Sequence, residues 1–364
     1  MSTLNVAQVL QQHRIVLCGG SGGVGKTTTA AALGMLAAQS GRRTLVLTID
    51  PARRLADAMG LAVIGNEPTP VPAVPNLSIM MLSAADSMDE LVARHATNQA
   101  DRDALLGNPY YQQISASVAG SREFLAMEKL HELAADRRFD LLVVDTPPSQ
   151  HALDFIDAPQ RLLDLLDGSG LGLILRTTSM ANRLSFGMVG QSQKQFAKLF
   201  EKLTGHRLML DLTAFFETFQ ELITGFKQRA ATMQKRLRSA DTAFLLVQLP
   251  QPESLQQAQG YVRRLQRESM QVAGVIFNQV HQIEALSDAA VAALNTQYPE
   301  GDLARRVLAG HAQWYALARA QRELIAQWQA QSSLPVIALP FLVGNVSSLA
   351  TLGVFASSLD ARAG

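Results

Sequence analysis

A glycine-rich segment near the N-terminus ends in a lysine followed by threonines. The segment fits the pattern G-x-x-x-x-G-K-[ST] and consists of Gly20, Ser21, Gly22, Gly23, Val24, Gly25, Lys26 and Thr27. Glycines let the backbone curl so that successive N–H groups face an anion, and the start of a following helix adds a favourable dipole. In such a loop the lysine reaches the β- and γ-phosphates and the threonine hydroxyl binds Mg²⁺. The segment predicts a nucleotide site, with Thr28 next to an α-phosphate oxygen.

Two aspartates follow apolar runs and come just before prolines. Asp50 precedes Pro51, and Asp145 is followed by Thr146 and Pro147. Parallel strands bring their carboxyl ends to one edge of a sheet, where the ligands of open α/β sheets bind. A carboxylate at that edge holds Mg²⁺, usually through water, or orients an attacking water molecule. Either aspartate alone is also compatible with a helix N-cap.

The elements that would position these residues are short apolar strands separated by helices. Because the runs are nearly continuous in apolar character, they are typical of strands covered on both faces, and the alternation with helices predicts a mainly parallel sheet. The fold class is therefore α/β, with a doubly wound sheet of the P-loop NTPase kind. The expected helices include 26–39, 121–135 and 253–266. The expected strands are Arg14–Cys18, Thr44–Ile49, Leu77–Leu82, Leu141–Val144, Thr242–Val247, Val272–Phe277 and Leu334–Leu339.

About a hundred residues between Val144 and Thr242 contain no convincing strand. Half of the 14 phenylalanines lie between Phe186 and Phe226, and apolar positions from Leu212 follow helical spacing. We expect an inserted helical subdomain at 167–238, between two parts of the NTPase core at 1–166 and 239–364. The phenylalanines form either the core of this subdomain or a groove for an apolar partner.

Composition excludes several classes of protein. Hydrophobic residues make up 48% of the 364 residues, enough for a large core, and the net charge of +1 gives no overall field that would attract nucleic acid. No apolar run is long enough to span a membrane, and the N-terminus lacks a secretion signal and leads directly into a strand. The single cysteine, Cys18, excludes an internal disulfide and is interpreted as a core residue. We expect a cytoplasmic protein.

Three motifs together resemble the ArsA-type ATPases. They are Gly-Gly-Val-Gly-Lys-Thr-Thr at 22–28, Thr-Ile-Asp-Pro-Ala at 48–52 and Asp-Thr-Pro-Pro-Ser at 145–149. This family includes arsenite-pump ATPases and the ATPase that targets tail-anchored membrane proteins. Together with MinD and ParA, it belongs to the deviant Walker-A class of P-loop NTPases. The resemblance extends over nearly the whole chain, and the insertion falls where the family carries its helical cargo-binding subdomain.

The resemblance implies a role for each matching residue. Lys26, Thr27 and Thr28 bind phosphates and Mg²⁺, and Lys26 and Asp50 take part in catalysis, with Asp50 polarising the attacking water. Asp145 lies near the metal, at the start of residues 145–149, which match the second of the family's nucleotide-responsive switch segments. The adenine base is surrounded by residues near the C-terminus, namely Asn278, Pro340 and Phe341.

The chain departs from the family at the second position of the glycine motif. Members usually carry there a lysine that reaches the nucleotide of the partner subunit, whereas this chain has Ser21. A hydroxyl neither spans that gap nor supplies positive charge, so we hypothesise that Arg53 or Arg54 stabilises phosphate charge instead. The alternative is that both are solvated, or that a different partner subunit supplies the charge. The Cys-x-x-Cys of some targeting members and the arsenite-binding cysteines are absent.

The sequence therefore predicts a Mg²⁺-dependent ATPase that works as a dimeric nucleotide switch. Its cofactors are ATP and Mg²⁺, and it is expected to form a homodimer, with a heterodimer as the alternative. The output is binding or release of a protein or apolar cargo, or control of a membrane transporter. A P-loop small-molecule kinase or synthetase is the alternative function. A partitioning ATPase of the MinD or ParA kind is less favoured, because the C-terminal stretch 347–359 contains no basic residue.

Overall fold

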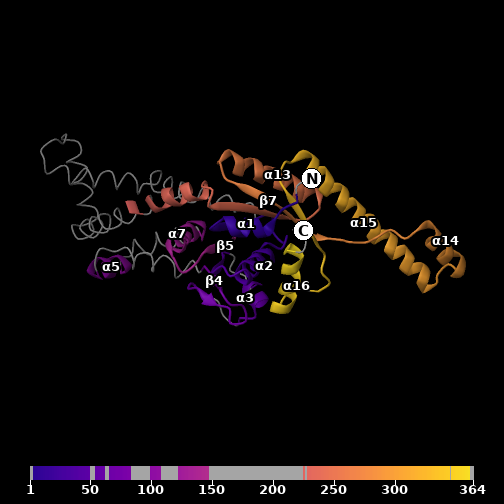
Figure 1. The fold of residues 1–364 in the computed structure, drawn as a ribbon, viewed down its shortest axis with the longest axis horizontal. Coiled ribbons are helices and arrows are strands. Elements are labelled where there is room, and N and C mark those ends of the chain that lie inside the picture. Colours follow the sequence, from indigo (N-terminus) through magenta and orange to yellow (C-terminus); the bar gives the residue numbers. More distant parts are fainter. Residues whose placement is uncertain are drawn as a thin grey trace, which may run out of the picture. The chain divides into compact units, whose positions relative to one another are not determined.

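The computed structural model forms two compact units (Figure 1). Unit 1 comprises Met1–Met81, Asp136–Leu153 and Arg236–Gly364, and unit 2 comprises Leu82–Ala135 and Asp154–Lys235. The structure describes residues 3–49, 54–61, 65–82, 99–107, 122–146, 224–225, 228–344 and 346–360.

Unit 1 is built on an eight-stranded sheet with the strand order β3-β4-β2-β5-β1-β6-β7-β8. All neighbouring strands are parallel except the pair β3 and β4. The mainly parallel sheet predicted from the sequence is thus confirmed. The strands are β1 (Ile15–Gly19), β2 (Thr44–Thr48), β3 (Thr69–Pro70), β4 (Leu77–Met81), β5 (Leu141–Asp145), β6 (Thr242–Gln248), β7 (Val272–Val280) and β8 (Val336–Pro340).

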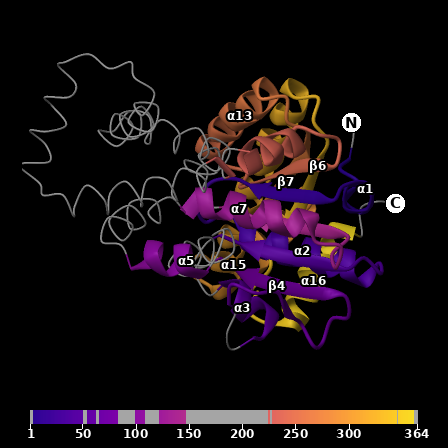
Figure 2. The same cartoon turned by 90° about the vertical axis from the view of Figure 1, so that its left-hand side faces the viewer.

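Helices cover the sheet of unit 1 on both faces, as Figures 1 and 2 show. On one face α2 contacts β1, β2 and β5 and packs against α16, while on the other α13 contacts β6 and β7, and α15 contacts β7. Among the described residues, no helix combines the length and apolar character that crossing a membrane requires. The helices of this unit are α1 (Val6–Gln12), α2 (Lys26–Gln39), α3 (Arg54–Met59), α13 (Pro252–Arg267), α14 (Asp288–Gln297), α15 (Leu303–Gln331) and α16 (Leu349–Asp360).

The core of unit 1 follows the two-residue period of its strands. Every residue of β1, β2, β5 and β6 is buried. Alternate residues, such as Val16, Val46 and Val143, join the cluster formed with the alanine-rich α2 and with α16. On the opposite face, Phe277 meets the edge of Trp328 from α15 at a ring separation of 6.2 Å. The central strands therefore have packed layers on both sides and hold their carboxyl ends in fixed positions.

One sequence-based expectation about this unit is wrong. The N-terminus does not lead directly into a strand, because α1 precedes β1; Asn5 caps α1 by accepting a hydrogen bond from the backbone N–H of Gln8 at 2.9 Å. The proline-rich stretch 68–75 contains a short strand, because Thr69 and Pro70 form β3. Proline is tolerated there because β3 lies at the edge of the sheet.

Unit 2 is helical over the residues that the structure describes. It contains α5 (Gln99–Leu106), α7 (Arg122–Ala135) and the helical residues 228–235. Inside this unit, Glu128 of α7 forms an ion pair with Arg229, with 2.6 Å between Oε2 and Nε. Burial raises the pKa of Glu128, and the hydrogen bond from Arg229 opposes that rise. Most of the expected insertion at 167–238, including the phenylalanine-rich segment from Phe186, lies outside the described residues.

Candidate functional site

The glycine-rich segment forms the connection between β1 and α2, at the carboxyl edge of the sheet. Gly20, Gly23 and Gly25 have φ of +151°, +78° and +91°, in the region that favours glycine. A Cβ at Gly20 would overlap the carbonyl oxygen of Val247, and one at Gly25 would overlap the side-chain amide of Asn278. Neither position accepts a side chain without movement of its neighbour, so the glycines give the loop its curled, close-packed path.

The loop leads directly into the N-terminus of α2. Lys26 is the first residue of α2; its side chain is buried, and Nζ donates a hydrogen bond to the carbonyl oxygen of Ser21 at 2.8 Å. Gly25 precedes it in a left-handed conformation, and no side chain within the described part of the chain caps the helix. An uncapped helix N-terminus beside a curled loop presents N–H groups and a lysine to an anion. This arrangement fits the phosphates of a nucleotide.

Asp145 lies at the end of β5, between β1 and β2. Its carboxylate Oδ2 accepts hydrogen bonds from Thr27 Oγ1 at 2.7 Å and from Thr48 Oγ1 at 2.9 Å, and the residue is 1% exposed. Thr27 comes from the first turn of α2, whereas Thr48 is the residue opposite Asp145 in β2. All three side chains carry oxygen donors, either hydroxyl or carboxylate, and oxygen is the ligand atom that Mg²⁺ prefers. Thr27 and Asp145 therefore carry oxygen donors of the kind that would bind a magnesium ion.

The next row of contacts holds β5 against β1. Thr146 donates a hydrogen bond from Oγ1 to the carbonyl oxygen of Cys18 at 2.7 Å. Cys18 is fully buried, and burial, with a contribution from the charge of Asp145, raises the pKa of its thiol. A neutral, inaccessible thiol is a packing group, which agrees with the interpretation of Cys18 as a core residue.

Asn278 braces the loop from the neighbouring part of the sheet. It is 4% exposed, and its Nδ2 donates to the carbonyl oxygen of Val24 at 2.9 Å, while its Oδ1 accepts from the backbone N–H of Gln279 at 2.9 Å. Gln279 has φ of +58°, where the register between β7 and β8 shifts. This irregularity turns the amide toward the loop. An amide carries two N–H groups and two carbonyl lone pairs, so one of each is left for a ligand.

Pro340 and Phe341 lie at the end of β8, beside the end of β7. The backbone N–H of Phe341 donates to the carbonyl oxygen of Val280 at 2.9 Å. The Phe341 ring, 46% exposed, stacks on His281 with 4.9 Å between centroids, and His281 stacks in turn on Trp314 at 5.0 Å. The sequence analysis did not identify His281. A stack of flat rings with an exposed end can take a further flat ring, such as a base.

Two residues of α13 that the sequence analysis missed contact the loop and the end of β1. Gln257 accepts a hydrogen bond from Ser21 Oγ, and the hydroxyl of Tyr261, one turn further, lies 2.6 Å from where a Cβ of Gly19 would stand. Burial raises the pKa of Tyr261, so the hydroxyl stays neutral. Gln257 and Tyr261 are more than 230 residues from the loop, and only their i, i+4 spacing could have suggested a shared role.

Several predicted site residues lie outside the described residues. They include Asp50, Arg53, the stretch 147–149 and the side chain of Arg54, whose backbone begins α3. Among the described residues, the structure brings the loop 20–28, Asp145 and Asn278 together and places Pro340 and Phe341 next to the strand that carries Asn278. Within that described part, no three His, Cys, Asp or Glu residues form a cluster that could hold a metal ion by themselves.

Comparison with known proteins places the chain in a family. The model of the anion-transporting ATPase family matches residues 13–293, which include the loop, Asp145 and Asn278. The chain is 28% identical over 276 residues to an ATPase ASNA1 homolog of Entamoeba dispar, covering 74% of this chain and 77% of that protein. An ATPase ASNA1 homolog of Paramecium tetraurelia is 26% identical over the same length, covering 74% and 76%. ATPase GET3 of Kluyveromyces lactis is 33% identical over 230 residues, 58% of this chain and 64% of that protein.

The match extends over far more than half of the chain and includes all the motifs on which the resemblance to ArsA-type proteins was based. The relatives named above are all ATPases. The fold, with its parallel sheet and its glycine loop between β1 and α2, agrees with the match. The chain therefore belongs to the anion-transporting ATPase family, and it is an ATPase.

Proposed function

We propose that this protein hydrolyses ATP with Mg²⁺ and uses the nucleotide state to bind and release a protein or apolar partner. The observation that carries the proposal is the shared geometry of the loop, Lys26, Thr27 and Asp145 at one edge of the sheet. The loop amides and Lys26 bind the β- and γ-phosphates, and Thr28 binds an α-phosphate oxygen. Family membership and the names of the relatives support the choice of ATP.

Thr27 and Asp145 would hold Mg²⁺, and Thr48 keeps the Asp145 carboxylate oriented by its own hydrogen bond. The ion neutralises part of the charge that develops on the phosphate oxygens. Lys26 supplies a second positive charge. Because it is buried and held by its hydrogen bond to the carbonyl oxygen of Ser21, it needs no rearrangement to do so. Asp50, two residues beyond Thr48, orients the attacking water.

The base is bound on the other side of the loop. Asn278 has one N–H and one carbonyl lone pair left for the edge of an adenine, after its contacts with Val24 and Gln279. Pro340 and the exposed ring of Phe341 offer apolar contact to its face. Because Asn278 touches both the loop and the base, it links the position of the base to the path of the loop.

The working unit is a homodimer in which the segments after Asp50 and Asp145 respond to the nucleotide and move the helical insertion. Ser21 does not reach the nucleotide of the partner subunit in the way that the family's lysine does, because its hydroxyl donates a hydrogen bond to Gln257 of its own chain. We assign the missing positive charge to Arg53 or Arg54. The partner is a protein, an apolar segment or a membrane transporter subunit.

The test is phosphate release by the purified protein during a Mg²⁺ titration, with two matched variants of one strand. Asp145→Asn removes the carboxylate at the carboxyl end of β5 and should lower turnover at least about tenfold, with a higher requirement for Mg²⁺. Asp140→Asn changes the aspartate just before the other end of β5 and should leave turnover unchanged. Equal turnover in both variants, or transfer of phosphate to a small molecule in place of release, would contradict the proposal.

A further inference from the structure

The ring that the proposed function assigns to the face of the adenine, that of Phe341, is only partly held by its own chain segment. Phe341 follows β8 directly, and its backbone N–H donates to the carbonyl oxygen of Val280 at 2.9 Å, but the residue is 46% exposed. A half-exposed side chain ordinarily samples several rotamers and loses that freedom when a ligand orders it, which weakens binding. Binding of the base is stronger where a neighbouring group fixes the ring beforehand.

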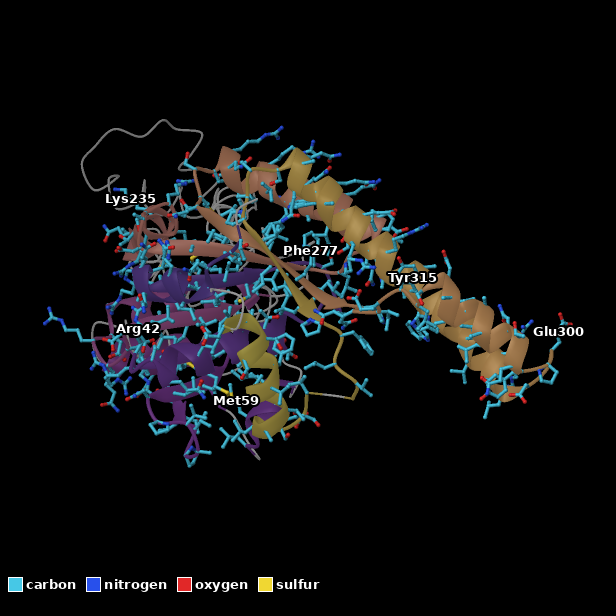
Figure 3. The ribbon with its side chains drawn as sticks, turned by 45° about the vertical axis from the view of Figure 1, so that its right-hand side comes forward. Arg42, Met59, Lys235, Phe277, Glu300 and Tyr315 are labelled. Carbon is cyan, nitrogen blue, oxygen red and sulfur yellow. The ribbon has the colours of Figure 1, made fainter. Side chains whose placement is uncertain are left out.

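The ring of His281, just after β7, lies against the ring of Phe341. Their centroids are 4.9 Å apart, and the angle between the ring planes is 14°. His281 also stacks on Trp314 of α15, with 5.0 Å between centroids and 28° between planes. Figure 3 shows α15 passing the ends of the strands near Tyr315, the residue after Trp314. The histidine therefore connects the segment after β8 to a long helix.

The edge of the His281 ring is held by Gln321, a buried residue two turns after Trp314 on α15. The side-chain oxygen of Gln321 accepts a hydrogen bond from the backbone N–H of His281 at 2.8 Å and lies 3.2 Å from Nδ1 of the ring. Because a backbone N–H needs an acceptor, the oxygen and not the amide nitrogen of Gln321 faces His281, so Nδ1 carries the hydrogen. A flipped ring would lose this bond. Helix α15 thus fixes the ring at its face and at its edge.

We infer that His281, held by α15, is a positioning residue for base recognition that fixes Phe341 as the surface on which the adenine rests. A base that rests on a fixed ring presents its edge to Asn278 at one height and in one orientation. Only an aligned edge lets the N–H and the carbonyl of Asn278 distinguish adenine from guanine. The inference rests on the base site of the proposed function and adds the residue that orients it.

A role in fold stability alone does not account for the stack. Phe341 and Trp314 remain 46% and 52% exposed, so the three rings bury little apolar surface. His281 also lies on the base side of the loop, three residues after Asn278, whereas the phosphates are assigned to the side of Lys26. Loss of the His281 ring should therefore weaken substrate binding and leave the chemical step intact.

Kinetics of phosphate release by the full chain test this role. His281→Ala removes the middle ring and should raise KM for ATP about fivefold, with kcat within about twofold of wild type. His281→Phe keeps a flat ring in the stack and should hold KM within about twofold of wild type. The matched control is His311→Ala, the same change at a histidine of α15 outside the stack, and it should leave both constants unchanged. A fall in kcat at constant KM, or equal losses in His281→Ala and His281→Phe, would overturn the inference.

A double variant tests whether His281 acts through Phe341. On the background of Phe341→Ala, the change His281→Ala should raise the dissociation constant of ATP by less than about twofold, because the ring that His281 positions is already missing. Losses that multiply would show that the two residues act independently and would contradict a positioning role. The melting temperature of His281→Ala without nucleotide should lie within about 2 °C of wild type. A larger fall would assign the stack to the fold.

Base selectivity provides a readout at equilibrium. In calorimetric titrations, His281→Ala should lose more affinity for ATP than for GTP, and its affinity for inorganic tripolyphosphate should equal that of wild type. An equal loss for all three ligands would place the damage in the phosphate loop and overturn the inference.

Phe341→Ala separates a failure of this inference from a failure of the proposed function. If Phe341→Ala lowers the affinity for ATP but His281→Ala does not, the base site stands and His281 does not position it. If the wild type binds ATP and neither variant weakens that binding, the base lies elsewhere, and both the base site and the inference are wrong. If the wild type does not bind ATP, the nucleotide site itself is wrong.

Discussion

The carboxyl edge of the sheet has two parts that are built differently. Around β5, β1 and the start of α2, the polar groups are buried and bound to one another, and the loop is fixed by backbone conformation at glycines. Around the ends of β7 and β8, the contacts are rings from three distant segments, and Phe341 and Trp314 remain about half exposed. The first part suits phosphates, which every nucleotide carries. The second part suits a base, and side-chain contacts there determine which base is bound.

This contrast implies that substitutions in the two parts have different kinds of effect on nucleotide binding. Changes on the phosphate side should abolish nucleotide binding or destabilise the fold, because charge and backbone path are lost together. Changes on the base side should weaken binding moderately and alter the preference between bases.

The largest effect is expected for Lys26→Ala. Its buried ammonium group is the positive charge that the loop directs at the phosphates. Loss of a buried charge partner typically weakens binding by about 100-fold or more. Calorimetric titration with ATP and Mg²⁺ should show that loss for Lys26→Ala, with far-ultraviolet circular dichroism unchanged. Affinity within threefold of wild type would remove Lys26 from the site.

The next prediction compares two glycines of the loop. Gly20→Ala should lower the free energy of unfolding by about 3 kcal/mol, because the new methyl group overlaps a backbone carbonyl and the φ of +151° is strained. Gly23→Ala has strain at φ of +78° but open space around it, so its loss should be about 1 kcal/mol. Urea unfolding without nucleotide measures both. Equal losses would mean that close packing under Gly20 does not shape the loop.

On the base side, Phe341→Ala should weaken ATP binding by about tenfold at most, since one ring contact is lost. It should also reduce discrimination between ATP and GTP. Inorganic tripolyphosphate, which has no base, should bind with the same affinity to the variant and to the wild type. Val343→Ala, at a position 97% exposed, is the matched control. An equal loss for tripolyphosphate would show that the two parts of the edge are not separable.

The smallest effect is expected far from the site, at Asp140. Hydrogen bonds from Arg43 hold the pKa of Asp140 down at about 2, below its ordinary value. Its contribution to stability is therefore present above about pH 4, and it is lost as the pH falls toward 2. Because the pair is exposed, Asp140→Asn should lower the melting temperature by less than about 2 °C at pH 7, with a smaller difference at pH 2.5. A difference that grows on acidification would contradict this sign.

The sequence predicted the strands, the loop and Asp145 because each depends on local information. The strand runs are apolar along their whole length, and the predicted helix at 26–39 agrees with α2 residue for residue. The helix α1 could also have been recognised, since Asn5 precedes apolar residues at 6, 9 and 10 with helical spacing. β3 could not, because a two-residue edge strand containing proline leaves no periodic pattern.

The supporting contacts of the site were not predictable in the same way. Thr48 was visible at the end of a strand, but its bond to Asp145 depends on which strand lies next to β5. Gln257 and His281 act through neighbours that tertiary packing brings to them. Trp314 and Trp328 are fourteen residues apart, a spacing that places both on one face of a helix and favours packing roles for both. Trp328 is buried, but Trp314 is half exposed, because α15 continues beyond the sheet that covers Trp328.

Calorimetric titration of the wild-type protein with ATP in excess Mg²⁺ tests the central claim most directly. If the loop at 20–28 binds a nucleoside triphosphate, the titration should saturate at one ATP per chain, and tripolyphosphate should compete for the same site. Folded protein that binds neither ATP nor ADP under these conditions would contradict the account.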